Sequence, residues 1–134
     1  MRCARYAGCN DRTRNARRRQ QELYDVNEAA AQFWSDRYIQ HSAHIEPGRD
    51  GLFDLIRSAP DTLHYEHQLI VAEGDYVVVH GRFTGNGRPV AWVAADVVRM
   101  EDGRLAEHWD VLQDEATEAE SKSGRPMFGD RFPS

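Results

Sequence analysis

The sequence predicts an α+β fold in which helical segments come first and a run of antiparallel strands follows. Before residue 40, apolar residues recur at spacings of three and four, which is the pattern of an amphipathic helix. From residue 62 onwards, apolar residues alternate with polar ones, and glycine-containing turns separate the alternating segments. Because helices precede the strands, we expect a curved antiparallel or mixed β-sheet with the N-terminal helices on its concave face, enclosing a pocket.

Two segments make up the helical part. The first helix is predicted over Arg14 to Tyr38, and its apolar stripe consists of Leu23, Val26, Ala30, Phe33 and Trp34. The second helix is predicted over Asp50 to Ser58, and Ala59-Pro60 ends it because proline cannot continue a helix. Between them, the segment from Gln40 to His44 indicates a loop or a brief extended piece.

The strands are predicted over Leu63 to Val71, Tyr76 to Phe83, and the two arms of Val90 to Gln113. Strict alternation places five residues of the first strand on one face: Leu63, Tyr65, His67, Leu69 and Val71. Turns are indicated at Gly74-Asp75, at Gly85-Asn86-Gly87 and at Asp102-Gly103. An Asp-Gly step between apolar alternating segments is the strongest short-range signal for a β-hairpin.

A chain of 134 residues, 40% hydrophobic and 29% charged, suits one globular domain. We expect that domain over residues 14–134, after a basic leader over residues 1–13 that is expected to be disordered. Residues 1–20 carry seven arginines and one acidic residue, whereas the rest of the chain carries 10 of the 17 basic and 21 of the 22 acidic residues. The leader could touch an acidic partner, although a solvated tail is the more common role of such a segment.

The charge balance and the hydropathy exclude several classes of protein. An acidic body argues against nucleic-acid binding by the folded domain. No apolar run is long enough to span a bilayer, and no apolar segment follows the leader as in a secretory signal, so we expect no membrane contact and a cytoplasmic location. Cys3 and Cys9 have no partners at zinc or disulfide-framework spacing and are expected to be exposed thiols.

The predicted hairpin carries a carboxylate in each arm. Asp96 and Asp110 lie at similar distances from the turn, so they can be close together on neighbouring strands. Whether they share a face depends on the register of the turn, which the sequence leaves open. Two carboxylates within an apolar strand pair are costly unless they are solvated, paired or used in chemistry. The hairpin is therefore the first place to look for a functional site.

The second arm also predicts an interface. Leu105, Trp109 and Val111 alternate with the residues on the Asp110 face and would be large apolar groups on the outer face of the sheet. Exposed apolar patches of this kind are typical of protein interfaces. We therefore expect a homodimer formed through the sheet.

Several stretches resemble a known family. AEGDYVVVHGRF and ADVVRMEDGRLAEHWDVLQ resemble the SnoaL-like polyketide cyclases, which belong to the nuclear-transport-factor-like superfamily of cone-shaped α+β folds. DRYIQH followed by GRDGL is similar to a helix-end and loop segment of the same group, and GRPMF is similar to the closing segment of one branch. The resemblance extends from about Ala30 to Phe128, and EHWDV is its most specific motif.

This resemblance implies a cone with a deep apolar pocket and one aspartate that acts as general acid and base. That aspartate matches Asp110, and the acidic residue of the preceding strand matches Asp96. The chain departs from the family where Ser42-Ala43 replaces a frequent Asn-Pro, and where the loop at Gly85-Asn86-Gly87 is short. Both departures change the mouth of the implied pocket and hence the expected substrate.

The chemistry that fits these residues is ring closure or isomerisation without a cofactor. An intramolecular aldol step needs a base to remove a proton next to a carbonyl, and a second group to protonate the other carbonyl oxygen. Asp110 would be the base, with Asp96 or His80 as its partner. In the alternative interpretation the two aspartates are structural and bind Arg82, Arg99 or a tyrosine. An epoxide-opening hydrolase and a non-catalytic binding protein for small molecules are the other two functions that remain open.

Four further residues are predicted to contact a small, largely apolar, carbonyl-bearing substrate: Tyr38, His41, Trp92 and His108. No metal site is expected, because the histidines have no paired spacing on a predicted strand or helix and the cysteines are remote. Gly85 and Gly87 belong to a turn and do not form a phosphate loop.

Overall fold

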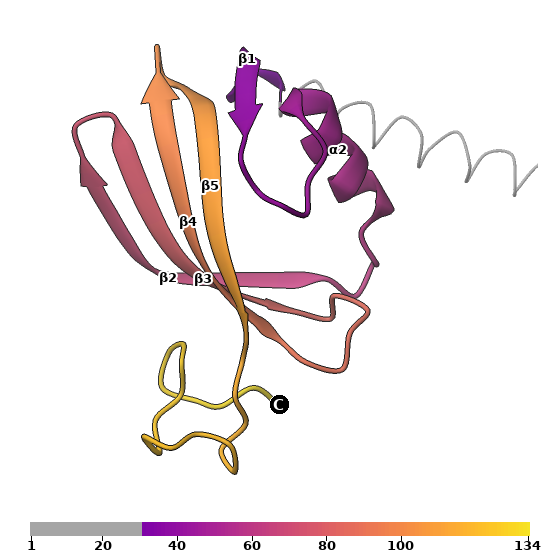
Figure 1. Ribbon diagram of the computed structural model, residues 1–134, viewed down its shortest axis with the longest axis vertical. Helices are drawn as coiled ribbons and strands as arrows, with labels where there is room; N and C mark the ends of the chain where they lie inside the picture. The colour runs from indigo at the N-terminus through magenta and orange to yellow at the C-terminus, as the bar shows by residue number, and fades with distance from the viewer. Residues whose placement is uncertain (1–30) are drawn as a thin grey trace, which may run out of the picture. The chain divides into compact units, whose positions relative to one another are not determined.

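The computed structural model describes residues 31–134, which contain one helix and five strands. In chain order these are β1 (Trp34–Gln40), α2 (Gly48–Ser58), β2 (His64–Glu73), β3 (Tyr76–Thr84), β4 (Trp92–Glu101) and β5 (Arg104–Asp114). The strands form a single sheet in the order β1-β5-β4-β3-β2 (Figure 1). Only the β1–β5 pair is parallel, so the sheet is mixed and the predicted α+β class is confirmed.

The first strand corrects the prediction of a helix as far as Tyr38. Residues Trp34 to Gln40 are extended and pair with β5, with Ile39 opposite Glu107 and Gln40 opposite His108. The pairing satisfies the backbone of this segment, so tertiary contact overrides its helical spacing. The leader over residues 1–13, and the predicted first helix as far as residue 30, lie outside the described residues.

The hairpin of β4 and β5 forms at the predicted turn. Asp102 and Gly103 both have positive φ, 50° and 74°, as a two-residue hairpin turn of this kind requires. A register shift between Arg99 and Met100 then places Asp96 opposite Asp110 and Val98 opposite His108, whereas Met100 lies opposite Leu105. Leu105 therefore lies on the same side of the sheet as Asp110, which corrects the prediction that it shares a side with Trp109 and Val111. Directly opposed residues of antiparallel strands point to the same side of the sheet. We call that side the Asp110 face, and the opposite side the outer face.

A bulge in β2 corrects the predicted alternation of that strand. The register between β2 and β3 shifts between His67 and Leu69, with His67 opposite Gly81 and Leu69 opposite His80. The extra residue reverses the side to which the later side chains point. As a result Leu69 lies on the outer face, whereas Tyr65 and His67 lie on the Asp110 face.

The short helix packs at the edge of the sheet that β1 forms. Figure 1 shows α2 beside β1 and next to the curved sheet. Phe53 is buried and meets the ring of Trp34 edge-on, with centroids 5.9 Å apart. The helix ends at Ser58, as predicted, and Ala59 before Pro60 is already extended. Among the described residues, no helix is long and apolar enough to cross a membrane.

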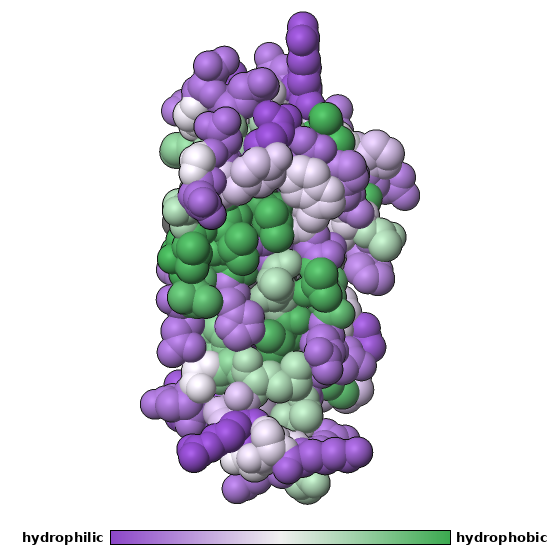
Figure 2. All heavy atoms as spheres, turned by 60° about the vertical axis from the view of Figure 1, so that its left-hand side comes forward, coloured by the Kyte–Doolittle hydropathy of each residue, from purple (hydrophilic) through white to green (hydrophobic). Residues whose placement is uncertain are grey.

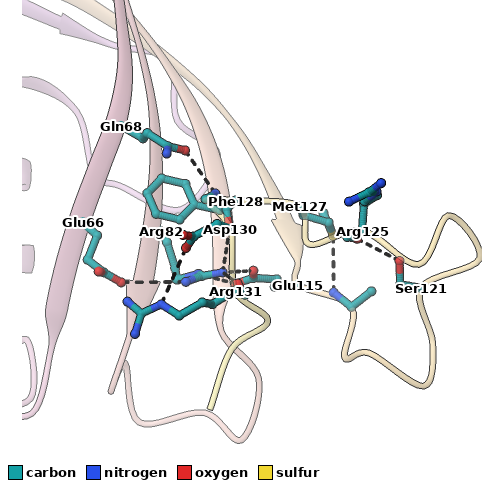
Figure 3. A network of polar contacts seen from close by, with 12 residues as sticks. Glu66, Gln68, Arg82, Glu115, Ser121, Arg125, Met127, Phe128, Asp130 and Arg131 are labelled. Atoms are coloured by element: carbon teal, nitrogen blue, oxygen red, sulfur yellow. Dashed lines mark hydrogen bonds and ion pairs between the residues drawn. The ribbon is translucent and has the colours of Figure 1, made fainter.

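After β5 the chain is irregular, and a buried ion pair anchors it to the sheet (Figure 3). Arg82 of β3 donates from Nε to Glu115 at 2.8 Å, and from a terminal nitrogen to the carbonyls of Phe128 and Arg131 at 3.0 and 2.7 Å. Only 6% of Arg82 and 2% of Glu115 is exposed to solvent. The C-terminal segment is therefore held by charge-assisted hydrogen bonds against the outer face.

Part of the outer face is apolar and open to solvent. Figure 2 shows apolar side chains gathered in the middle of one side of the molecule. The large apolar residues of the outer face that are more than a third exposed are Ile39, Leu69, Val71, Tyr76, Val78 and Val111. Val111 is the most exposed of these, at 70%. Trp109, by contrast, is partly covered within the chain by the rings of His41 and Tyr76.

Candidate active site

Three ionisable side chains meet on the Asp110 face. Asp96 and Asp110 are opposed in the register, and His108 lies two residues before Asp110 on the same strand face. The Nε2 atom of His108 lies 2.8 Å from Asp96 Oδ1, and the two side chains are 12% and 19% exposed. The hairpin therefore brings both predicted carboxylates and His108 into one partly buried cluster.

A residue that directly follows β1 binds Asp110. The hydroxyl of Ser42, which follows that strand, donates to Asp110 Oδ2 at 2.7 Å, and Ser42 is only 6% exposed. Because a parallel strand pair places β1 directly beside β5, a segment almost seventy residues earlier in the chain supplies this contact. This hydrogen bond fixes the orientation of the Asp110 carboxylate on the sheet.

Two phenols lie near the carboxylates. Tyr38 is 5% exposed, and its burial raises its pKa to about 12, with the charges of Asp96 and Asp110 acting in the same direction. Burial, followed by the charge of Asp96, also raises the pKa of Tyr65. Tyr65 lies across Gly81 of β3, where a side chain would come within 2.5 Å of its hydroxyl oxygen. Both phenols therefore keep their proton and can donate a hydrogen bond.

The same cluster offers ligands of the kind that a divalent cation binds. Asp96, His108 and Asp110 each present one ligand atom, and these atoms lie within 4.8 Å of one another. Carboxylate and imidazole are ordinary ligands for such ions. However, the hydrogen bond between His108 Nε2 and Asp96 occupies the nitrogen that a cation would need.

The structure separates two predicted residues from this cluster. His80 pairs with Ala95 and points to the outer face, where its ring lies 5.5 Å from that of Phe128. His41 also turns to the outer face. Its Nε2 lies 2.7 Å from Glu107, and its ring stacks on Trp109 with centroids 4.8 Å apart. Neither histidine is placed to exchange a proton with Asp110, because the sheet lies between them.

Trp92 lies on the Asp110 face but at its far end. It is four residues from Asp96 on β4, and its indole nitrogen donates to Asp114 at 2.9 Å. The Arg88 guanidinium lies 4.8 Å from its ring centroid. Among the residues predicted to contact substrate, Tyr38 and His108 are thus in the cluster, Trp92 is at its margin, and His41 is outside it.

In the alternative interpretation the two aspartates bind Arg82 or Arg99, but both arginines bind other partners. Arg82 pairs with Glu115, and Arg99 donates to Glu107 at 2.9 Å on the outer face. The aspartates are therefore not neutralised by the arginines that the alternative names. Their described partners are an imidazole and a hydroxyl, both of which can take part in proton transfer.

Sequence reasoning missed three residues of the site: Gln40, Ser42 and Tyr65. Tyr38 and Gln40 are two residues apart, so recognising β1 as a strand would have placed both on one face. Gln40 accepts a hydrogen bond from His108 Nδ1 at 2.8 Å. Ser42 was marked only as a departure from the family pattern at the mouth of the implied pocket. Tyr65 carries no comparable signal, because it reaches the cluster through contacts that no local pattern contains.

A cavity lies away from this cluster. Its volume is about 200 Å³, and it is lined by Glu66, His67, Gln68, Arg82 and residues 128–131. Two of its polar side chains bind the C-terminal segment: Arg82 donates to Glu115 and to two backbone carbonyls, and Gln68 accepts from the Gly129 backbone. This cavity lies where the C-terminal segment packs against the sheet.

The fold and the cluster together define a class of protein. It is an α+β protein with a mixed, curved sheet, one face of which carries carboxylates, an imidazole and protonated phenols. The family described as the SnoaL-like domain matches residues 22–108, and the chain belongs to this family. The match ends two residues before Asp110.

Solved structures agree with this fold. TsrD from Streptomyces laurentii is 22% identical, with a TM-score of 0.55 over 69% of this chain and 87% of that protein. A proposed polyketide cyclase from Bacillus cereus is 22% identical, with a TM-score of 0.54 over 65% of this chain and 63% of its own. An NTF-2 like protein of unknown function from Burkholderia xenovorans is 17% identical, with a TM-score of 0.54 over 71% and 76% of the two chains. No curated protein matches the chain.

Proposed function

We propose that this protein is an acid/base enzyme that works without a cofactor, closing a ring by an aldol step or moving a proton in a small, largely apolar carbonyl compound. The single observation that carries the proposal is the meeting of Asp110, Asp96 and His108 on one face of the sheet. Membership of the SnoaL-like family, and the likeness to a structure described as a proposed polyketide cyclase, support this class of reaction.

In the proposed reaction, Asp110 removes a proton from the carbon next to a carbonyl group. The negative charge moves to the carbonyl oxygen, where the hydroxyls of Tyr38 and Tyr65 can stabilise it because both phenols remain protonated. The resulting enolate attacks a second carbonyl within the same molecule, or is reprotonated at another carbon. The Asp96–His108 pair supplies the proton to the oxygen that develops charge.

The test compares the wild-type protein with Asp110→Asn, which keeps the shape of the side chain and removes the base. The readout is incorporation of deuterium at the α-carbon of cyclic ketones and β-diketones in heavy water, followed by NMR. We expect the variant to lose about 10²- to 10⁴-fold in exchange rate while its melting temperature is retained. Asp75→Asn, in the turn before β3, is the control and should exchange at the wild-type rate.

The outcome that contradicts the proposal is wild-type exchange in Asp110→Asn. Absence of exchange and of product in the wild-type protein, together with retained ligand binding, would instead favour a non-catalytic binding protein. Both results are accessible with the same compounds, since binding is measured by calorimetry and turnover by NMR.

An epoxide-opening hydrolase is the second candidate function. The Ser42 hydroxyl beside Asp110 favours it, because a carboxylate with a polar neighbour can hold and activate a water molecule. Incubation of small epoxides in ¹⁸O-labelled water distinguishes the two functions. A labelled diol that disappears in Asp110→Asn would support the hydrolase, whereas deuterium exchange without diol formation supports the cyclase or isomerase.

We also propose that a second copy of the chain covers the outer face. Val111 and its apolar neighbours form an exposed apolar patch (Figure 2). In a dimer with two-fold symmetry, the patch of one copy would pack against the same patch of the other copy. Val111→Lys should convert a dimer to a monomer in light scattering, whereas Asp61→Lys, in the exposed turn before β2, should not. A wild-type protein that is monomeric at high micromolar concentration contradicts this proposal.

A further inference from the structure

Gln40 connects the two halves of the site. Its side-chain oxygen lies 3.0 Å from the backbone nitrogen of Ser42 and 2.8 Å from Nδ1 of His108. Its side-chain nitrogen lies 3.2 Å from the hydroxyl of Tyr38. One amide therefore contacts the imidazole, a phenol, and the backbone of the residue whose hydroxyl holds Asp110.

The orientation of this amide is set by the backbone. A backbone N–H is always a donor, so the Gln40 atom that faces Ser42 must be the oxygen, which can only accept. The amide nitrogen then points to Tyr38 and donates to it. Because the same oxygen faces His108, the Nδ1 atom of His108 must carry a hydrogen to make its 2.8 Å contact.

The hydrogen on Nδ1 determines what the other ring nitrogen can do. One hydrogen lies between Nε2 and Asp96, since two would clash and none would leave two acceptors facing each other at 2.8 Å. With Nδ1 protonated, Nε2 or Asp96 can give up this hydrogen and leave a neutral imidazole. If Nδ1 were bare, loss of the Nε2 hydrogen would leave an imidazolate, which is far too basic to form here.

We propose that Gln40 is a positioning residue that holds His108 in the form protonated at Nδ1, and thereby makes the Asp96–His108 pair the proton donor and leaves Asp110 the proton acceptor. The division of roles rests on the proposed function, whereas the form of the imidazole does not. In one turnover, Asp110 gains the proton that leaves carbon, and the substrate oxygen gains the proton held between His108 and Asp96. Exchange with solvent then returns one proton to the pair and removes one from Asp110.

The arrangement gives the two aspartates different tasks despite their opposed positions. Asp110 receives a hydrogen bond from Ser42 and makes no contact with a ring nitrogen in the described structure, so it is an acceptor free to take a proton. Asp96 already faces one proton. A pair of carboxylates in which only one faces a proton is the usual arrangement for an acid and a base in one site.

The direct test is ¹⁵N NMR of the full chain labelled in its histidines, with His108→Gln used to assign the signals of His108. In the wild-type protein, Nδ1 of His108 should show the shift and one-bond coupling of a protonated nitrogen. Gln40→Leu removes the acceptor and should shift Nδ1 towards the unprotonated position. Gln40→Glu keeps an acceptor oxygen and should retain the wild-type signal, and Gln113→Leu is the control on β5.

Turnover separates the two parts of the inference. Gln40→Leu should lower kcat about tenfold or more with KM changed less than twofold, and Gln40→Glu should recover most of it. A bare Nδ1 in the wild-type protein, or unchanged signals in Gln40→Leu, overturns the positioning role. Altered signals with unchanged kcat, when Asp110→Asn abolishes turnover, overturn the donor role alone. If Asp110→Asn also leaves turnover unchanged, the proposed function fails while the form of His108 stands.

Discussion

Replacement of Glu115 by alanine should destabilise the domain more than any single change at its surface. Glu115 is 2% exposed, and its carboxylate accepts two hydrogen bonds from the Arg82 guanidinium, which is itself 6% exposed. In Glu115→Ala the guanidinium stays buried without its counter-charge. Its remaining acceptors are the backbone carbonyls of Phe128 and Arg131. A carboxylate oxygen of Glu66 lies 3.9 Å from Nη1 of Arg82.

Removing one member of a buried ion pair costs about 3–5 kcal/mol, because the other charge is left uncompensated. The two carbonyls and the neighbouring carboxylate offset part of this cost, so we expect a loss of about 3 kcal/mol. For a domain of this size, each kcal/mol lowers the melting temperature by about 3–5 °C. The expected fall is therefore about 10–15 °C.

Urea unfolding followed by circular dichroism measures this loss, and calorimetry measures the fall in melting temperature. The double variant Arg82→Met with Glu115→Met removes both charges and should be more stable than Glu115→Ala. Asp130→Asn, in the same segment with its side chain 95% exposed, is the control and should unfold like the wild type. A loss below about 1 kcal/mol in Glu115→Ala, or a double variant less stable than the single one, refutes the reasoning.

Three further outcomes are expected. Hydrogen bonds from His41 and then Arg99 hold the pKa of Glu107 below its usual 4.5, so its contribution to stability is present above pH 4.5 and is lost as the pH falls through the lowered pKa. Glu107→Gln should therefore flatten the dependence of melting temperature on pH in that acid range, and an unchanged profile would contradict this. Gly81→Ala should cost about 1–3 kcal/mol by overpacking against Tyr65, and Tyr65→Leu in the same background should recover part of that loss in urea unfolding. Dialysis against EDTA should leave turnover unchanged, because a proton occupies the ring nitrogen that a cation would need.

The hairpin of β4 and β5 was predictable only in part. Its turn is local, because Asp102-Gly103 adopts the positive φ values that a two-residue turn needs. The pairing of Asp96 with Asp110 also depends on the register shift between Arg99 and Met100, without which the turn would place Asp96 opposite Trp109. The connection from β3 to β4 is longer and does not fix a register. The sequence therefore could not decide on which side of the sheet His80 lies relative to Asp96, and the structure places them on opposite sides.

The edge strand was mispredicted for a different reason. Trp34 and Tyr38 are four residues apart, a spacing that fits a helical turn as well as alternate positions of a strand. The partner that decides between them is β5, more than sixty residues later, with Gln40 opposite His108. Because parallel pairing depends on that distant segment, no window around β1 contains the information. Because β1 was not predicted, the roles of Gln40 and Ser42 could not be predicted either.

The position of β5 between β1 and β4 has a consequence for synthesis of the chain. Among the strands of residues 31–134, β1 is made first, but the neighbour with which it pairs is β5, the last of the five to be made. The hairpin partner β4 and the edge strand β1 must both wait for residues 104–114 before either can complete its pairing. A nascent chain that ends before residue 104 thus carries Tyr38, Gln40 and Ser42 but no imidazole or second carboxylate for them to meet. Any reactivity of the cluster begins only after residues 104–114 have been synthesised.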